Sequence, residues 1–455
     1  MKNINCFKAY DIRGSVPEEL NENIAYLISR AFIEFTNAKN VVLGMDIRLS
    51  SEKIKRSIID GITDAGSDII DIGLVGTEVV NFTTSYGKFD GGIMVTASHN
   101  PPNYNGMKIV RKGSKPISEN TGLKEIRTIA ERNNFRKKEN KGKVYNKNYI
   151  KQYIEKILSF IDINSLKPLK IVVNAGNGAA GPTLDVLENY LPFDFIKINH
   201  NPDGSFPNDV PNPMIKKNRS ITSDAVIKSN ADIGIAWDGD YDRCFFFDEE
   251  GKFIDGYYLV GLLSNFFLTR NPNNNIIYDP RLIWNTLELV EKSRGKAIQC
   301  KSGHAFIKEK MREHDAIYGG EMSAHHYFRD FYFCDSGMIP WLIITQIMSS
   351  ENRSLSSLVK DRMKLFPISG EINLSVDDAS EITKLLEKKY TKYAKKIDKM
   401  DGISFEFEDW RFNLRSSNTE PLIRLNIETK NNASLLNEKT KSLLKDINYN
   451  ENVIE

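Results

Sequence analysis

The sequence predicts an α/β protein made of three similar mixed α/β domains with largely parallel sheets and a smaller C-terminal α+β domain. Three stretches, which begin near residues 41, 171 and 276, each run from a buried apolar strand through an amphipathic helix to a second strand. Strands that alternate with helices are typical of parallel sheets covered on both faces. The last stretch, residues 371–455, instead has alternating strands flanked by Lys-rich amphipathic helices, which is typical of an α+β domain.

The elements of the three repeated stretches follow the same order along the chain. The turn Asp-x-Arg-Leu occurs at residues 46–49 and again at 279–282, which indicates internal duplication. The predicted strand, helix and strand span 41–45, 54–62 and 69–72 in the first stretch, 171–173, 184–191 and 195–198 in the second, and 276–278, 287–292 and 297–300 in the third.

The C-terminal stretch supplies two predicted strands, 405–407 and 422–427, and two predicted helices, 382–393 and 435–444. A chain of 455 residues is too long for one hydrophobic core and predicts three or four domains. The predicted domains span residues 1–152, 153–255, 256–370 and 371–455.

Composition excludes several classes of protein. Lys plus Arg is 62 and Asp plus Glu is 60, so no global field favours nucleic acid or an anionic membrane. The four cysteines are scattered without CxxC spacing, which argues against a disulfide framework and a structural zinc site. No apolar run reaches the length of about 18 residues that a membrane span needs, and residues 1–14 do not resemble a signal peptide. We therefore expect a cytoplasmic enzyme.

Each repeated stretch ends with a further short strand that leads into a polar loop. Ligands of open α/β sheets bind beyond the carboxyl ends of strands, so we expect these loops to converge on one active-site cleft between the domains. The strands and loops are 91–96 with 97–101, 233–237 with 238–240, and 317–318 with 319–323.

Asp238, Asp240 and Asp242 place three carboxylates at alternate positions of one turn. Such carboxylates repel one another and favour a hard cation such as Mg²⁺ or Ca²⁺. A helix–loop–helix calcium site is excluded because Arg243 stands where that loop needs Gly and residues 244–247 read as a strand. A solvated acidic turn is the alternative.

Ser98 is a candidate nucleophile or phosphate carrier, because its loop follows a strand and ends in two prolines. The loop lacks the glycines of a hydrolase elbow at positions 96 and 100. His99, the next residue, is expected to be poorly placed to act as the base of Ser98. A structural turn is the alternative.

Two further loops carry groups that suit a phosphosugar. Glu321 and Ser323 offer the acceptor and hydroxyl that recognition of vicinal sugar hydroxyls requires, and a polar loop cap is the alternative. Residues 415–419 combine a guanidinium, hydroxyls and an amide, as a phosphate cradle does, and a solvated Ser-rich turn is the alternative.

Residues 176–181 fit the GxGxxG pattern of a dinucleotide site. The acidic residue expected about 20 positions later is missing from the end of the next strand, where residues 197–200 read KINH. We therefore expect these glycines to serve close strand-to-helix packing, and a nicotinamide-dependent dehydrogenase remains an alternative.

Taken in order, the loops TASHNP (96–101), DGDYDR (238–243), GEMSAH (320–325) and RSSNTEP (415–421) resemble the four signature loops of the α-D-phosphohexomutase superfamily. The opening KAYDIRG (8–14) also matches. The GEMS motif resembles the phosphomannomutase/phosphoglucomutase branch, and the chain is similar to bacterial members that supply GDP-mannose for surface polysaccharides.

The resemblance implies that a phosphorylated Ser98 interconverts mannose 6-phosphate and mannose 1-phosphate through a hexose 1,6-bisphosphate. It implies Mg²⁺ as cofactor, held by Ser98, Asp238, Asp240 and Asp242. It also implies catalytic roles for Ser98, Arg13, Lys108 and His304. The residues implied to bind substrate are Tyr10, Arg243, Arg281, Gly303, Glu321, Ser323, His325, Arg415, Ser417, Asn418 and Thr419.

Sugar preference stays open, because some family members use Lys where Arg281 stands and no loop residue reveals which face of C2 is read. A phosphoglucomutase or an enzyme of dual specificity is the nearest alternative. A metal-dependent sugar phosphatase and a non-catalytic phosphosugar sensor are the others. We expect a small-molecule phosphosugar as partner, no nucleic acid or membrane, and a monomer or homodimer.

Overall fold

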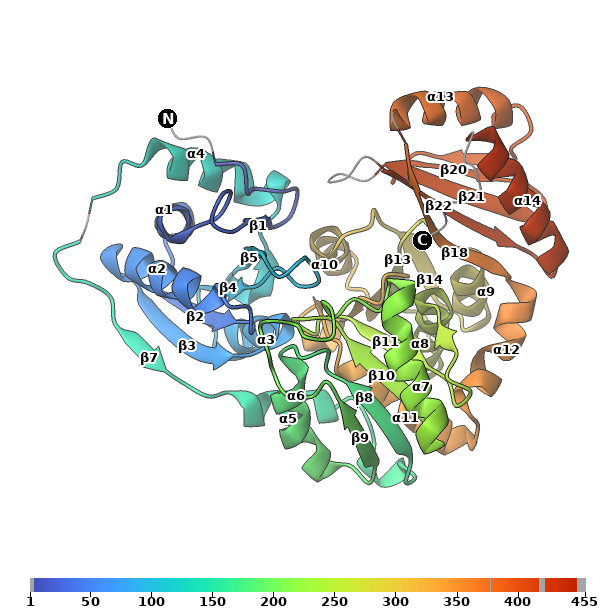
Figure 1. Cartoon of the computed structure of the whole chain (residues 1–455), viewed down its shortest axis with the longest axis horizontal. Coiled ribbons are helices and arrows are strands. Elements are labelled where there is room, and N and C mark those ends of the chain that lie inside the picture. The colour runs from blue at the N-terminus through green and yellow to red at the C-terminus, as the bar shows by residue number, and fades with distance from the viewer. Residues whose placement is uncertain (1–3, 137, 377, 417–421, 448–455) are drawn as a thin grey trace. The chain divides into compact units, whose positions relative to one another are not determined.

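The computed structural model describes residues 4–136, 138–376, 378–416 and 422–447 (Figure 1). The chain divides into two compact units. Unit 1 comprises residues 1–254, 303–313 and 324–355, and unit 2 comprises residues 255–302, 314–323 and 356–455. Unit 1 therefore holds the first two predicted domains and unit 2 most of the other two. The predicted domain boundaries themselves stay a prediction.

The first sheet of unit 1 has the strand order β1-β5-β4-β2-β3-β7, with β6 paired to β5. Its centre, β4-β2-β3, is parallel, whereas β5 runs antiparallel to β4. Its elements are β1 (Ile12–Ser15), α1 (Glu22–Thr36), β2 (Asn40–Met45), α2 (Ser51–Asp64), β3 (Asp68–Leu74), α3 (Thr77–Tyr86), β4 (Gly91–Val95), β5 (Tyr104–Arg111), β6 (Lys115–Pro116), α4 (Lys124–Arg132) and β7 (Val144–Asn146).

Apolar side chains on both faces of this sheet explain why helices cover it on both sides. Val41 and Leu43 belong to the core that includes apolar residues of α1, α2 and α4. Val42, between them, packs with Val80 of α3 on the opposite face. Successive strand residues point to opposite faces, so an unbroken apolar strand requires two covering layers.

The second sheet of unit 1 has the order β12-β11-β10-β8-β9. Its centre is again three parallel strands, and β11 and β12 continue the sheet in antiparallel pairing. The remaining elements of unit 1 are α5 (Ile150–Leu158), β8 (Lys170–Asn174), α6 (Ala180–Leu187), β9 (Asp194–Ile198), α7 (Ser220–Ser229), β10 (Ile233–Trp237), β11 (Cys244–Phe247), β12 (Phe253–Ile254), α10 (His304–Glu313), β16 (His326–Phe328), β17 (Cys334–Asp335) and α11 (Ile339–Glu351).

Unit 2 contains a third parallel core, in which β13 pairs with β14 and β15, and an antiparallel sheet of order β18-β22-β21-β20-β19. Helices α13 and α14 contribute apolar residues to one core with this C-terminal sheet. Its elements are α8 (Gly256–Arg270), β13 (Asn275–Tyr278), α9 (Trp284–Lys292), β14 (Lys296–Gln299), β15 (Tyr318–Gly320), α12 (Leu355–Leu365), β18 (Ile368–Ser375), α13 (Ala379–Tyr390), β19 (Lys396–Asp398), β20 (Ile403–Glu406), β21 (Trp410–Ser416), β22 (Leu422–Thr429) and α14 (Ala433–Asp446).

The predicted fold class is confirmed by the repeated order of the parallel strands. In β4-β2-β3, β10-β8-β9 and β15-β13-β14, the first strand of each repeat lies between the other two. The serine, aspartate and sugar-recognition loops leave the carboxyl ends of the corresponding strands β4, β10 and β15. Each repeat therefore presents its polar loop from the same place in the fold.

Two predicted helices have different ends in the structure. The helix predicted over 184–191 ends at Leu187, and a short 3₁₀ turn covers residues 188–190. The helix predicted to start at Ile382 starts at Ala379, because the carboxylate of Asp378 accepts hydrogen bonds from the N–H groups of Ser380 and Glu381. An N-cap of this kind sets the first turn of a helix independently of its apolar periodicity.

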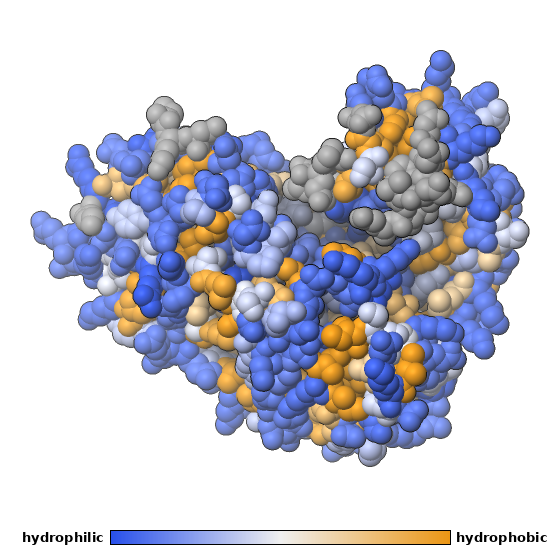
Figure 2. Space-filling model, in the orientation of Figure 1, coloured by the Kyte–Doolittle hydropathy of each residue, from blue (hydrophilic) through white to orange (hydrophobic). Residues whose placement is uncertain are grey.

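On the face drawn in Figure 2, hydrophilic residues predominate and hydrophobic residues occur in separate patches. All four cysteines are buried and free. None of the described helices is both long and apolar enough to traverse a lipid bilayer.

Candidate active site

Ser98 lies at the start of the loop that follows β4, and its backbone has a φ of 50°. Such a left-handed conformation is uncommon for a residue other than glycine and persists where surrounding contacts maintain it. The Ser98 N–H donates to Oγ1 of Thr96 over 2.8 Å, and the Ser98 Oγ donates to Oδ2 of Asp238 over 2.7 Å. The hydroxyl is therefore held against the aspartate loop of the second domain.

Arg48 supports the Ser98 loop through hydrogen bonds to its backbone. The sequence did not identify Arg48 as a site residue. Its guanidinium donates to the carbonyl oxygens of Ser98 and Asn100 over 2.9 and 2.6 Å. It also donates to the carbonyl oxygens of Pro101 and Tyr104. The Asp-x-Arg-Leu repeat was the signal that could have identified this residue.

Asp238, Asp240 and Asp242 are almost fully buried and place carboxylate oxygens within 4.8 Å of one another. Lys108 Nζ lies 2.6 Å from Oδ2 of both Asp240 and Asp242. The Oδ1 atoms of the same two aspartates are buried and have no hydrogen-bond partner among the described residues. Hard carboxylate oxygens that remain unpaired in a buried site fit a divalent cation such as Mg²⁺.

The charges of this cluster shift its pKa values in opposite directions. Burial opposes ionisation of Asp240, but the adjacent Lys108 ammonium holds the pKa of this carboxyl below its usual range. Burial raises the pKa of Asp242, and the negative charge of Asp240 raises it further. Lys108 and Arg243 therefore supply two positive charges to three carboxylates, which leaves a role for a further cation.

Thr77 and Glu78, at the start of α3, are two further residues that sequence reasoning missed. Thr77 Oγ1 donates a short hydrogen bond to Asp240. Glu78 is fully buried, and burial raises the pKa of its carboxyl well above the usual value. No motif marked either residue, because their neighbours in this site come from distant parts of the chain.

The expectation that His99 is poorly placed to act as the base of Ser98 stays a prediction, although the two side chains are in contact. The His99 Nδ1 lies 3.0 Å from Ser98 Oγ, since the left-handed turn at Ser98 brings the two side chains together. Burial lowers the pKa of His99 well below its usual value, and the charge of Arg243 lowers it further. Arg243 donates a hydrogen bond to His99 Nδ1 and forms an ion pair with Asp238 over 2.9 Å, so it contacts both neighbours of the serine hydroxyl.

The predicted residues Arg13, Tyr10 and His304 also belong to unit 1. Arg13 donates to Oδ1 of Asn100, in the serine loop, over 2.6 Å. The rings of Tyr10 and His304 meet edge to face with centroids 5.0 Å apart, beside Gly303, whose φ is 124°. Burial lowers the pKa of His304 well below its usual value, so this ring is neutral at pH 7.

His325 lies between two carboxylates of unit 1. Its Nδ1 is 3.3 Å from Oδ2 of Asp335 and 3.8 Å from Oδ1 of Asp242. The backbone of His325 also forms a β-bridge with Arg243, directly after the aspartate triad. This predicted substrate-binding residue is therefore adjacent to the metal-binding candidates.

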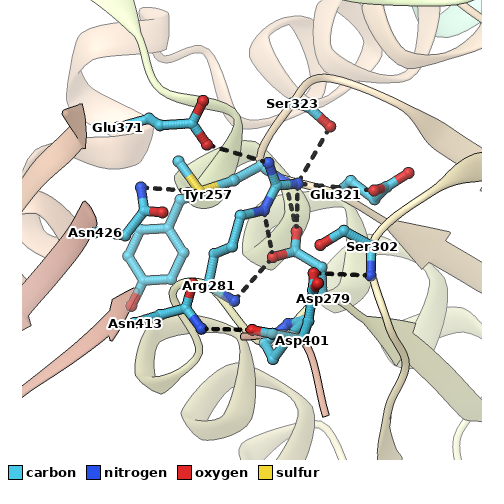
Figure 3. Close-up of polar contacts among 12 residues, drawn as sticks. Tyr257, Asp279, Arg281, Ser302, Glu321, Ser323, Glu371, Asp401, Asn413 and Asn426 are labelled. Atoms are coloured by element: carbon cyan, nitrogen blue, oxygen red, sulfur yellow. Dashed lines mark hydrogen bonds and ion pairs between the residues drawn. The ribbon is translucent and has the colours of Figure 1, made fainter. Parts of the chain in front are cut away.

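Unit 2 contains the residues predicted for sugar recognition (Figure 3). Asp279 accepts a hydrogen bond from the N–H of Met322 over 2.8 Å, which fixes the backbone between Glu321 and Ser323. Arg281 donates to Oγ of Ser323 over 3.2 Å and lies 3.7 Å from Glu321. Arg281 therefore supports the sugar-recognition loop as Arg48 supports the serine loop.

The structure gathers the predicted residues into one group in each unit. Of the phosphate cradle, Arg415 is described, whereas Ser417, Asn418 and Thr419 lie outside the described residues. The single cleft between the four domains stays a prediction. The group of unit 1 consists of Tyr10, Arg13, Ser98, Lys108, Asp238, Asp240, Asp242, Arg243, Gly303, His304 and His325, and that of unit 2 consists of Arg281, Glu321, Ser323 and Arg415.

The glycine-rich turn at residues 176–181 packs against its neighbours at distances that leave no room for side chains. A Cβ at Gly178 would lie 2.8 Å from the carbonyl oxygen of Gly239, and one at Gly181 would lie 2.1 Å from that of His200. The N–H of Ala179 also donates to the Gly239 carbonyl over 3.1 Å. These glycines thus serve close packing and support the aspartate loop.

A serine hydroxyl buried against three carboxylates, on loops at the carboxyl ends of strands in a repeated α/β fold, indicates an enzyme that transfers phosphoryl groups. The chain matches family models described as phosphoglucomutase/phosphomannomutase domains I, II, III and C-terminal over residues 5–137, 149–251, 255–366 and 371–442. This chain belongs to the phosphoglucomutase/phosphomannomutase family.

Relatives extend over the whole chain. A protein of Escherichia coli (strain K12) named phosphomannomutase is 51% identical, and the match covers 98% of this chain and 100% of that protein. A protein of Xanthomonas campestris named phosphohexose mutases is 52% identical over 96% of this chain and 98% of its own length. The crystal structure of a family protein from Burkholderia thailandensis, 30% identical, superposes with a TM-score of 0.87 and covers 100% of both chains.

Proposed function

We propose that this protein is a phosphomannomutase that interconverts mannose 6-phosphate and mannose 1-phosphate. The observation that carries the proposal is the 2.7 Å hydrogen bond between the Ser98 hydroxyl and Asp238, inside a triad suited to a divalent cation. Full-length relatives that are named phosphomannomutase support the choice of sugar. The mannose 1-phosphate formed would supply GDP-mannose for surface polysaccharides.

In this proposal a phosphorylated Ser98 donates its group to the substrate. The bond between Ser98 Oγ and phosphorus breaks as a sugar hydroxyl oxygen forms a bond to phosphorus. The proton that the sugar hydroxyl loses is matched by one taken up at Ser98 Oγ, which gives a hexose 1,6-bisphosphate and a free serine hydroxyl. The other phosphoryl group of that sugar then returns to Ser98 by the reverse step. Positioning and charge stabilisation account for most of the acceleration of such transfers.

The residues of unit 1 stabilise charge on the transferring group. Asp238, Asp240 and Asp242, together with an oxygen of phosphorylated Ser98, would hold Mg²⁺, and the bound ion would offset negative charge on the transferring group. Lys108 and Arg13 add positive charge beside the serine loop. The residues of unit 1 proposed to contact the substrate are Tyr10, Arg243, Gly303, His304 and His325. The neutral imidazole of His304 suits proton transfer.

The residues of unit 2 bind the part of the substrate that does not react. Glu321 and Ser323 bind sugar hydroxyls, while Arg415, Ser417, Asn418 and Thr419 bind the second phosphate. Arg281 is proposed as a substrate contact as well, but only 2% of its side chain is exposed. We therefore propose that Arg281 acts on the substrate by supporting Ser323 and not by direct contact.

The first experiment is intact-mass measurement with phosphosite mapping of protein purified from cells. We expect one added phosphate on Ser98, and loss of mutase activity in the Ser98→Ala variant at unchanged melting temperature. Ser15→Ala is the control, because this serine ends β1 outside the aspartate cluster. A fully active Ser98→Ala protein would exclude the serine relay.

The second experiment compares kcat/KM for mannose 1-phosphate and glucose 1-phosphate, with inorganic phosphate measured in the same assays. We expect the mannose substrate to be preferred and almost no phosphate to be released. A strong preference for glucose would identify a phosphoglucomutase, and stoichiometric phosphate release would identify a phosphatase. Cytoplasmic location and a monomeric or homodimeric state stay predictions.

A further inference from the structure

Glu371, on β18 in unit 2, is a half-buried carboxylate with three arginine neighbours and no role in the proposed mechanism so far. Its side chain is 10% exposed. Oε2 lies 3.6 Å from Nη1 of Arg281 and 3.4 Å from Nη2 of Arg415, and Oε1 lies 3.8 Å from Nε of Arg424. Figure 3 shows Glu371 directed toward Arg281.

All three contacts of Glu371 are long for charge-assisted hydrogen bonds, which are about 2.7–2.9 Å when well formed. Asp279, by contrast, binds the same Arg281 at 2.8 Å. Glu371 is therefore near each guanidinium without a tight bond to any of them. A carboxylate in this position neutralises charge but is easily displaced as a ligand.

The arginines differ in how far they reach solvent. The exposed fraction of the side chain rises from 2% for Arg281 to 16% for Arg415 and 31% for Arg424. Buried Nε of Arg415 has no hydrogen-bond acceptor within the part of the chain that is described, and its second carboxylate, Asp401, is 3.7 Å away. Arg415 thus keeps donor capacity for an anion that arrives from solvent.

The electrostatic environment agrees with this geometry. Burial lowers the pKa of Arg415, and repulsion from Arg281 lowers it further, whereas Glu371 opposes both effects. Burial opposes ionisation of Glu371, but the three arginines hold its pKa below the usual value. The negative charge of Glu371 thus offsets part of the repulsion among the three guanidinium groups.

We propose that Glu371 is a positioning residue that acts as a displaceable counter-ion for Arg415 until a phosphate group of the substrate takes its place. The carboxylate and the phosphate compete for the same guanidinium, so Glu371 weakens phosphate binding while it orients the arginine. The identity of the phosphate as a sugar phosphate rests on the proposed function. The competition between the Glu371 carboxylate and a phosphate does not depend on the proposed function.

The test is the affinity of the full-length protein for inorganic phosphate, measured by isothermal titration calorimetry in wild type and Glu371→Gln. Removing one negative charge close to a bound dianion is expected to lower the Kd for phosphate by about tenfold. The KM for hexose phosphate should fall in parallel without a rise in kcat, because the gained binding is common to ground and transition states.

Glu381→Gln is the matched control, since it removes the same charge from an exposed position on α13 and is expected to leave the phosphate Kd unchanged. Glu371→Asp withdraws the carboxylate by one methylene and should lower the Kd by a smaller factor. This variant provides the test if Glu371→Gln does not fold. A phosphate Kd that is unchanged or raised in folded variants would overturn the proposal. A wild-type protein without mutase activity would contradict the proposed function but leave this comparison valid.

Discussion

Arg48 and Arg281 occupy equivalent turns in two repeats of this chain. The N–H of each donates over 3.0 Å to the aspartate two positions earlier, Asp46 or Asp279. The guanidinium of each then supports a functional loop, the serine loop in one case and the sugar-recognition loop in the other. The two repeats therefore share a supporting arginine as well as an order of strands.

Replacing Arg48 by Met should lower kcat without unfolding the protein. The carbonyl oxygens of the Ser98 loop would lose their common donor, and misplacement of a reacting group by about 1 Å costs on the order of 100-fold in rate. Steady-state kinetics and melting temperature measure the two effects. Arg56→Met is the control, because the Arg56 side chain is 73% exposed and its replacement is expected to lower kcat far less. Equal kcat for both variants would contradict a supporting role of Arg48.

Replacing Arg281 by Lys should raise KM by about tenfold, which corresponds to one hydrogen bond to a charged group. An ammonium cannot bind both oxygens of Asp279 and still reach Ser323, because it lacks the planar fork of a guanidinium. Phosphorylation of Ser98, measured by intact mass, should be unaffected. Unchanged KM for the hexose phosphate would show that Arg281 does not set the position of the sugar-recognition loop.

Lys108 and a divalent cation should compensate for each other. Lys108→Met leaves the carboxylates of Asp240 and Asp242 without their cation, and breaking a buried pair in this way costs about 3–5 kcal/mol. We expect a lower melting temperature in EDTA and a larger stabilisation by Mg²⁺ than in wild type, measured by differential scanning fluorimetry.

The matched control for this metal experiment is Lys55→Met, which breaks the ion pair, 2.8 Å long, that joins Lys55 on α2 to Asp71 on β3. It should lower the melting temperature as well, but Mg²⁺ should stabilise it no more than wild type. The same Mg²⁺ response in both variants would contradict a metal site at the aspartate triad.

Glu78→Gln should change how stability depends on pH. The folded-state pKa of Glu78 lies well above the ordinary 4.5, so the folded protein binds a proton that the unfolded chain releases as pH rises past that value. Wild type therefore loses stability with rising pH, whereas a neutral amide does not. Between pH 5 and pH 8, the urea midpoint of wild type should therefore fall relative to the midpoint of the Glu78→Gln variant.

Glu52→Gln serves as the control for the pH experiment, because 45% of the Glu52 side chain is exposed. Its midpoint should follow that of wild type across the same range. A parallel pH dependence of Glu78→Gln and wild type would mean that Glu78 is ionised in the folded protein.

The sequence alone determined the fold class, the order of the repeated elements and the chemistry of the polar loops. Apolar strands and amphipathic helices have periods that are visible locally, and Ser98 or the three aspartates stand out within their own short segments. The supporting turn around Asp279 and Arg281 was visible as a repeat, although its purpose was not.

Only the tertiary structure decided which distant residues meet. Ser98 and Asp238 are 140 positions apart, and the approach of His99 to the serine hydroxyl depends on one backbone angle. Glu78 and Glu371 belong to no motif, because their importance comes from burial and from charged neighbours on other elements. Long-range packing sets both the dielectric environment and the distances between charges, and no local pattern of residues encodes either.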